Sequence, residues 1–261
     1  MDNPYIRLTR EFNFGRLRAI LASGQAVVLY RLAIMSKDGD WILKEEAAAL
    51  THVLATLDRH GARYRCGAPL DLRWLAHGWS SHLEFQEDGL RLRCDFVTRP
   101  PRISAVALQA LWEAPVQKEV PIVSLSVLAE IKKTNREKDY AVIGELARRM
   151  EDPRLRALYS RSARDLIQLA AEHPVAVQEA AAERPLLSRL GQGRDEIESL
   201  LDAERRALIR ANEDRLDRYL AAAKPWGEEW GRLSKELSGR PLSTAHEMMV
   251  GRAAELLPHE P

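Results

Sequence analysis

The sequence predicts an α+β N-terminal region, in which a small mixed sheet is flanked by helices, followed by an all-α C-terminal region. Before about Met150, short runs that favour strands alternate with helical patterns. After it, Ala, Leu, Glu and Arg dominate, and apolar residues recur at every third or fourth position. This change of pattern favours two domains, residues 1–150 and 151–261.

Turn and capping residues divide the first region into elements. Gly61 ends an amphipathic helix, Gly89 supplies the turn of a hairpin, and Ser124 can cap a later helix. The expected helices are 24–32, 45–60, 70–76, 124–133 and 137–150, and the expected strands are 39–43, 63–66, 82–86, 90–97 and 120–123. Short strands interleaved with helices in this way are typical of a small sheet with helical layers.

Proline and glycine divide the second region into four expected helices, 153–172, 174–190, 194–223 and 242–257. The 194–223 segment is highly charged, with acidic residues four positions before arginines. We expect this helix to pack against its neighbours, although a face that binds a partner is an alternative.

Composition narrows the classes of protein to consider. The chain has 39 basic and 38 acidic residues, so it lacks the basic excess of a protein that binds nucleic acid by bulk charge. Two cysteines, Cys66 and Cys94, are too few for a disulfide framework and fit a reducing compartment. The sequence shows no signal peptide and no apolar run of the roughly 20 residues that span a bilayer. We therefore expect a cytoplasmic protein without a membrane partner.

Three aspartates form the sharpest candidate site. Asp38 and Asp40 lie two residues apart at the entrance to an expected strand, so in an extended chain both project from one face. Asp95 lies in a second strand with strict alternation, on the face that also carries Arg91 and Arg93. If the two strands are neighbours, three carboxylates converge, and such a cluster requires hard cations. The alternative is three unrelated surface acids.

Two further features could bind phosphate. A small-residue turn at Ser23 and Gly24 opens a helix, where backbone N–H groups can approach a phosphate closely. Lys132 and Arg136 belong to a cationic segment at the junction of two helices. The alternatives are an ordinary helix start and cations that complement the C-terminal end of a helix.

In this order, the residues resemble the nucleotidyltransferase superfamily related to DNA polymerase β. The nearest members are small bacterial nucleotidyltransferase-like proteins, including the toxins of abortive-infection systems. In that family a Gly-Gly or Gly-Ser turn precedes an acidic-x-acidic pair, and a third carboxylate follows on a neighbouring strand. Later in the family's sequences come three further features, which this chain matches with the segment 120–124, with Lys132 and with the Arg-x-Lys-Asp element at 136–139. The resemblance covers roughly residues 20–150.

This chain departs from the family pattern at two places. The family's glycine pair is Ser23-Gly24 or Gly24-Gln25 here, and the usually apolar residue between the two acids is Gly39. Both departures affect the expectation of catalytic activity more than the expectation of the fold. A protein that keeps the fold without catalysis, and serves as a nucleotide- or partner-binding module, is therefore the alternative function.

The resemblance implies a reaction and a site. Asp38 and Asp40 would bind two Mg²⁺ ions that bridge the triphosphate of an NTP, and Asp95 would complete the site near the attacking hydroxyl. Ser23, Gly24, Ser36 and Lys37 would contact the phosphates, with Lys132 or Arg136 as a second tier. A nucleoside monophosphate would pass to an unknown acceptor, which could be RNA, a protein or a small molecule. A partner protein of the toxin–antitoxin type is also possible.

Other chemistries find less support. A metal-dependent phosphohydrolase would use the same carboxylates with water as the acceptor. The seven histidines show no paired spacing for zinc, although His82 could lie beside the cleft. Neither cysteine has a reactive signature, and Cys94 falls on the apolar face of its strand.

Overall fold

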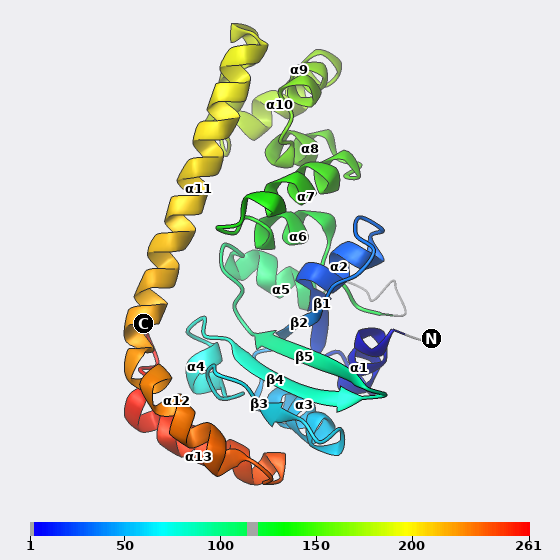
Figure 1. Ribbon diagram of the computed structural model, residues 1–261. Helices are drawn as coiled ribbons and strands as arrows, with labels where there is room; N and C mark the ends of the chain where they lie inside the picture. Colours follow the sequence, from blue (N-terminus) through cyan, green and yellow to red (C-terminus); the bar gives the residue numbers. More distant parts are fainter. Residues whose placement is uncertain (1–2, 114–119) are drawn as a thin grey trace. The chain divides into compact units, whose positions relative to one another are not determined.

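A computed structural model describes residues 3–113 and 120–261 (Figure 1). The chain forms two compact units, Met1–Val123 with Asp217–Pro261 (unit 1) and Ser124–Leu216 (unit 2). These bounds differ from the domains expected from the sequence, 1–150 and 151–261, because the C-terminal segment packs into the unit that contains the sheet. The domain division at residue 150 stays a prediction.

Unit 1 is built on a five-stranded mixed sheet in the order β1-β2-β5-β4-β3 (Figure 1). The strands are β1 (Ala19–Ala22), β2 (Asp38–Leu43), β3 (Arg63–Tyr64), β4 (Ser81–Glu87) and β5 (Leu90–Val97). β2 and β5 are parallel, and the other neighbouring pairs are antiparallel. Helices flank this sheet, and most of the later chain is helical, so the α+β fold class is confirmed.

The sheet has one apolar and one polar face. Residues at alternate positions of a strand share a face, and residues in register across strands share it too. Trp41 pairs with Phe96, and both are buried, whereas Asp40 pairs with Asp95 on the opposite face. Cys94 is fully buried on the apolar face, as predicted, and burial raises the pKa of its thiol.

Aromatic rings join the apolar face to α1 (Pro4–Phe12). Trp41 stacks on Phe96 with ring centroids 5.4 Å apart, and Phe12 meets Trp41 edge to face at 5.3 Å. The Trp41 indole Nε1 donates to Oγ1 of Thr9 on the same helix at 2.9 Å. Each buried ring contributes roughly 1.5–3 kcal/mol, so this contact fixes α1 firmly on the sheet.

Three more helices complete the packing of unit 1: α3 (Ala47–Arg59), α12 (Lys224–Leu237) and α13 (Leu242–Leu256). The Trp226 indole of α12 donates to the carbonyl of Gly67 at 3.0 Å. The Tyr64 hydroxyl lies 2.7 Å from Nδ1 of His246 on α13. These bonds attach the C-terminal helices to β3 and to the loop that follows it.

The shorter helices of unit 1 are α2 (Ser23–Leu29), α4 (Leu72–Leu75) and α5 (Ala105–Glu113). The strand expected at 120–123 is a single bridge, in which Ile122 lies beside Leu21 of β1. Four elements were not predicted: α1, β1, α5 and α12. All four residues of β1 are buried, so its sequence shows no alternation of polar and apolar residues.

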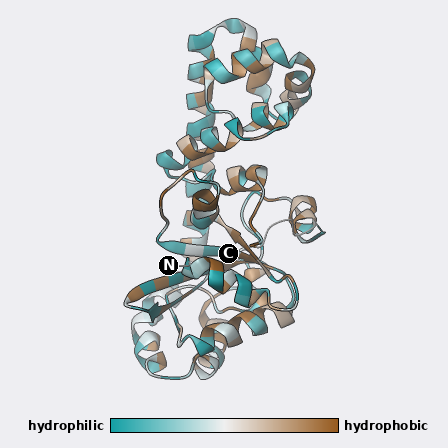
Figure 2. Ribbon diagram, turned by 90° about the vertical axis from the view of Figure 1, so that its right-hand side faces the viewer, coloured by the Kyte–Doolittle hydropathy of each residue, from teal (hydrophilic) through white to brown (hydrophobic). Residues whose placement is uncertain are grey.

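Unit 2 contains α6 (Leu125–Ile131), α7 (Glu137–Arg148), α8 (Pro153–Tyr159), α9 (Ala163–Glu172), α10 (Pro174–Ala181), the 3₁₀ helix η1 (Pro185–Gln192) and most of α11 (Arg194–Ala222). Hydrophilic and hydrophobic residues alternate along its helices (Figure 2). Ser124 caps α6, as predicted, by accepting a hydrogen bond from the amide of Val127 at 3.3 Å.

The helix expected at 153–172 is interrupted. Ser160 leaves the helical conformation, and Ser162 caps α9 through its contact with the amide of Asp165 at 3.2 Å. Pairs of serines favour such breaks because their hydroxyls compete for backbone groups. Among the described residues, no helix is both long and apolar enough to cross a membrane.

Candidate active site

The polar face of the sheet carries all three predicted acids. Asp38 and Asp40 project from β2, and the parallel register sets Asp40 directly beside Asp95 and Asp38 beside Arg93. Neighbouring strands are about 4.8 Å apart, so the first of these pairs can approach a common ligand. The condition that the two strands are neighbours is met, and the prediction that Asp95 shares a face with Arg91 and Arg93 is confirmed.

Asp95 is oriented through one of its two oxygens. Oδ1 accepts hydrogen bonds from Nδ1 of His82 at 2.7 Å and from Nη1 of Arg65 at 3.1 Å. His82 is directly opposite Asp95 in the register of β4 and β5, and its Nε2 lies 2.9 Å from Oγ of Ser80. Oδ2 of Asp95 has no hydrogen bond to any residue that the structure describes. The carboxylate is thus held in place with one oxygen available.

Asp38 presents a different environment. Its Oδ1 is buried and makes no hydrogen bond within the described part of the chain. The guanidinium of Arg93 lies 3.6 Å away, at ion-pair distance. Oδ1 thus has an ion-pair partner but no hydrogen bond, so a cation that binds it directly would stabilise it further.

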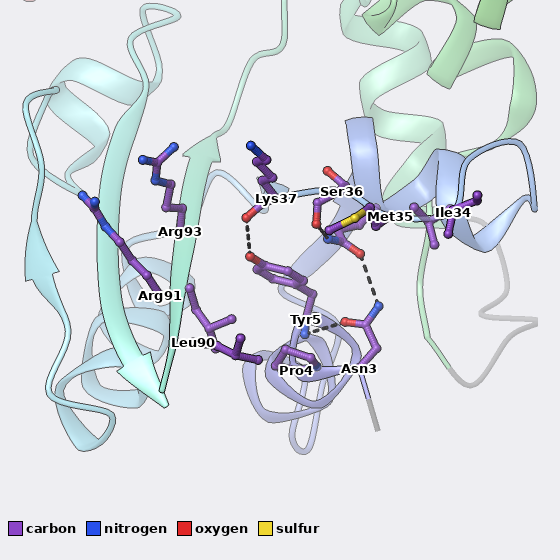
Figure 3. Close-up of a pocket in the computed structure, with 13 residues that line it drawn as sticks. Asn3, Pro4, Tyr5, Ile34, Met35, Ser36, Lys37, Leu90, Arg91 and Arg93 are labelled. Atoms are coloured by element: carbon purple, nitrogen blue, oxygen red, sulfur yellow. Dashed lines mark hydrogen bonds between the residues drawn. The ribbon is translucent and has the colours of Figure 1, made fainter. Parts of the chain in front are cut away.

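The loop that precedes β2 is fixed by residues of α1 and α2. The buried Gln25 side chain donates to the carbonyl of Ser36 at 3.0 Å. The Tyr5 hydroxyl donates to the carbonyl of Lys37 at 2.6 Å (Figure 3). Burial raises the pKa of Tyr5 to about 12, helped by the charges of Asp38 and Asp40, so its hydroxyl keeps the proton that it donates. Two bonds to consecutive carbonyls therefore define where β2 begins.

A cavity of about 500 Å³ lies beside this loop. Its lining includes Tyr5, Gln25, Ser36, Lys37 and Arg93 (Figure 3). Lys37 is exposed and makes no ion pair with another described residue. The cavity therefore offers the Lys37 cation and the Ser36 hydroxyl close in sequence to Asp38, the first aspartate of the pair.

Gly39, the departure between the two acids, has a steric cause. A Cβ at this position would lie 2.5 Å from Cδ1 of Tyr5 and 2.4 Å from the ring of Trp41. Gly39 faces the apolar side of the sheet, where the two rings occupy the space of a side chain. The glycine is thus required by the packing of α1, and it leaves Asp38 and Asp40 on the polar face.

The turn at Ser23 and Gly24 adjoins the acids, because the preceding residue, Ala22, pairs with Asp40. Ser23 has φ of +48°, in the left-handed region that favours glycine. A Cβ on Gly24 would lie 2.2 Å from Oγ of Ser36, so a larger residue would require this side chain to move. The serine thus adopts the backbone conformation that a glycine would adopt easily.

Lys132 and Arg136 belong to unit 2, where both contact Asp139. Nζ of Lys132 lies 3.6 Å from Oδ1, and Nη2 of Arg136 lies 2.8 Å from Oδ2. Lys132 and Asp139 are buried, so these contacts join the end of α6 to the start of α7. A role of the two cations in phosphate binding stays a prediction.

The donor chemistry suits a hard divalent cation, but the set is incomplete. Among the described residues, no group of three or more His, Cys, Asp and Glu side chains is arranged to hold a metal ion. Asp38 and Asp40 supply carboxylate oxygens from one strand face, which fits Mg²⁺. Asp95 could add only Oδ2, since His82 and Arg65 occupy Oδ1.

Comparison with known proteins gives two distant structural likenesses. No family model matches the chain, and no curated protein matches it. A "putative nucleotidyltransferase from H. pylori" is similar over 81% of this chain and 94% of its own, with 13% identity and a TM-score of 0.41. JHP933 from Helicobacter pylori is similar over 84% of this chain and 94% of its own, with 15% identity and a TM-score of 0.40. The case for function therefore rests on the geometry of the site.

Replacing Gly39 by Ala tests the steric account of the departure. The new methyl group would collide with Tyr5 and Trp41, so we expect the free energy of unfolding to fall by about 1–3 kcal/mol. Gly231→Ala is the matched control, because a Cβ there meets nothing within 4 Å in the middle of α12. The control should gain about 0.5–1 kcal/mol. Urea denaturation of both variants checks this, and an unchanged Gly39→Ala would contradict it.

Glu84, on β4 near this site, gives a prediction about pH. Burial alone would raise the pKa of Glu84, but hydrogen bonds from Arg91 and Arg63 outweigh it and hold the pKa below its usual 4.5. A lowered folded-state pKa gives stability that is present above the unfolded value and is lost as the pH falls through the folded one.

We therefore expect the wild type to lose part of its free energy of unfolding as the pH drops below about 4.5. Glu84→Gln should lack that part of the dependence. Glu113→Gln, an exposed change on α5, should keep it. Denaturant titrations between pH 3 and 7 make the comparison, and parallel curves for the wild type and Glu84→Gln would be inconsistent with the account.

Proposed function

We propose that this protein is a metal-dependent nucleotidyltransferase, which moves a nucleoside monophosphate from an NTP to an acceptor hydroxyl. The observation that carries the proposal is the β2–β5 register, which sets Asp40 beside Asp95 with Asp38 on the same polar face. Carboxylates gathered on one face suit a hard divalent cation such as Mg²⁺, which can carry a triphosphate.

The chain's own residues have separable roles in this reaction. Asp38 and Asp40 would hold Mg²⁺, which when bound neutralises charge on the triphosphate and on the leaving pyrophosphate. Asp95 would take the proton of the acceptor hydroxyl on Oδ2, while His82 and Arg65 keep the carboxylate oriented through Oδ1. A bond forms between the acceptor oxygen and the α-phosphorus, and the bond from the α-phosphorus to the bridging oxygen breaks as pyrophosphate leaves.

Phosphate contacts would come from the turn and the loop beside the acids. The backbone of Ser23 and Gly24 opens α2 next to Asp40, and Ser36 packs against Gly24. Lys37 adds a cation without an ion-pair partner among the described residues. Lys132 and Arg136 remain second-tier candidates, although Asp139 already balances part of their charge.

The proposal also covers the substrates, a partner protein and the cellular location. The NTP would be the donor, and the acceptor could be RNA, a protein or a small molecule. A partner protein of the toxin–antitoxin type and a cytoplasmic location also remain predictions. The alternative is a protein that keeps the fold but lacks catalysis, and the following experiment distinguishes it from an active enzyme.

Thermal unfolding with each NTP, with and without Mg²⁺, tests the site. A nucleotide at 100 times its Kd stabilises the folded state by about 2.7 kcal/mol. For a protein of this size that corresponds to a rise in Tm of roughly 5–10 °C. Asp38→Asn should abolish the magnesium-dependent part of the rise, because it removes a charged metal ligand.

Two further variants complete the design. Asp88→Asn lies in the exposed β4–β5 turn and should behave as the wild type. Asp95→Asn should retain nucleotide binding while abolishing transfer of an α-³²P label from the NTP to the acceptor in a cell extract. A magnesium-dependent rise in Tm without any labelled product would favour the non-catalytic alternative. No rise with any NTP would refute the proposed function.

A further inference from the structure

A second charged group lies on the same sheet face, on the far side of Asp95 from β2. Its centre is Glu84 of β4, whose side chain is only 6% exposed. Arg63 of β3 and Arg91 of β5 donate to opposite oxygens of this carboxylate, at 2.9 and 2.6 Å. Arg65 lies between the two acids, 3.7 Å from Oε2 of Glu84 and 3.1 Å from Oδ1 of Asp95. We call these three arginines and Glu84 the arginine cluster.

The arginine cluster carries more positive than negative charge. Its three guanidinium groups face two carboxylates, those of Glu84 and Asp95, so one positive charge is in excess. The carboxylate is the buried partner, whereas the Arg63 side chain is 72% exposed and that of Arg91 is 52% exposed. An exposed layer of guanidinium groups over a buried anion is well suited to contact an external phosphate.

Two hollows meet at the arginine cluster. A cavity of about 490 Å³ is lined by Arg63, Arg65, Glu84 and Arg240, with the ring of Trp230 beside them. A smaller one of about 300 Å³ is lined by Arg63, Arg91 and Glu84. Arg240 donates to the carbonyl of Glu236 and makes no ion pair with a described residue, so it adds a second unbalanced cation. The larger cavity lies within the usual size range of small-molecule sites.

We propose that the arginine cluster binds a phosphate group of the acceptor. This inference rests on the proposed function, in which Asp95 receives the proton of the acceptor hydroxyl. In the sheet order, β1 and β2 carry the turn and the aspartates that would hold the NTP, and β4 and β3 lie on the other side of β5. The acceptor must approach opposite the leaving pyrophosphate, which is the side of the arginine cluster.

Arg65 sets the spacing within such an acceptor. Because the Arg65 guanidinium reaches both Asp95 and Glu84, a phosphate on the cluster lies one side chain away from the Asp95 carboxylate. The acceptor class is therefore a phosphorylated compound whose hydroxyl and phosphate are a few bonds apart. A nucleic-acid strand end and a small phosphorylated sugar share this chemistry, and experiment can distinguish them.

The competing explanation is purely structural. Arg63 lies directly opposite Glu84 in the register of β3 and β4, and Arg91 lies diagonally from it on β5. Oppositely charged neighbours of this kind stabilise a sheet by roughly 0.2–1 kcal/mol per pair. On that account the arginines set the register and bind nothing. The two accounts differ in whether an added anion changes the environment of the guanidinium groups.

NMR spectra of the arginine Nε–Hε groups, recorded without metal or NTP, separate the accounts. Inorganic phosphate should shift the Arg63, Arg65 and Arg91 signals saturably, and should leave the signal of Arg16, beyond α1, unchanged. The double variant Arg63→Gln/Arg91→Gln should weaken phosphate binding at Arg65 at least fivefold. Arg16→Gln is the matched control and should bind phosphate as the wild type does. Each variant should still unfold in one cooperative transition, with a lower Tm for the double variant because the buried Glu84 loses two of its partners.

A second titration uses a short single-stranded oligonucleotide with a free 3′-hydroxyl. If it shifts the same signals at lower concentration than phosphate, the source of the phosphate is a nucleic-acid end. If phosphate alone shifts them, the acceptor is a small phosphorylated compound. If neither probe shifts them, or Arg16 responds equally, the inference is overturned. Since no NTP or metal is present, this outcome is independent of the nucleotide-binding test of the proposed function.

Discussion

The parallel pairing of β2 with β5 is the constraint on which the rest of unit 1 depends. It matches Trp41 with Phe96 on the buried face and Asp40 with Asp95 on the polar face in one register. A slip of β2 by one residue would move Trp41 into water and Asp40 into the core. The hydrophobic contact that stabilises the fold therefore also fixes the position of the acids. Structure and candidate site cannot be altered separately along these strands.

The same coupling extends to the departures from the family pattern. Tyr5 packs where a side chain of residue 39 would project, and its hydroxyl holds the loop that leads into β2. Gly24 allows Ser36 to approach, and Ser36 belongs to that loop. A glycine between the acids is thus part of how α1 supports the site from the apolar side. Neither departure, Gly39 nor the turn at Ser23 and Gly24, removes a carboxylate from the polar face.

Alternation along 90–97 and the i, i+2 spacing of Asp38 and Asp40 were enough to predict the polar face of the sheet. The neighbour relation of the two strands was a hypothesis, because pairing depends on contacts distant in sequence. The sequence can place His82 beside the cleft but not opposite Asp95, and it carries no signal for Arg65, since their alignment appears only in the register of β3, β4 and β5. β1 was missed because a fully buried strand has no periodicity, and the compact units were not foreseen because Trp226 and its neighbours pack against the sheet from the far end of the chain.

Paramagnetic broadening by Mn²⁺ tests the central claim, that the polar face around Asp40 and Asp95 binds a metal–nucleotide complex. The measurement adds Mn²⁺ to the isotope-labelled protein in the presence of a non-hydrolysable NTP. The account predicts that the backbone amide signals of Asp38, Asp40 and Asp95 broaden first, while that of Val53, in α3 on the apolar side, stays sharp. Broadening centred on another part of the chain, or none that requires the nucleotide, would contradict it.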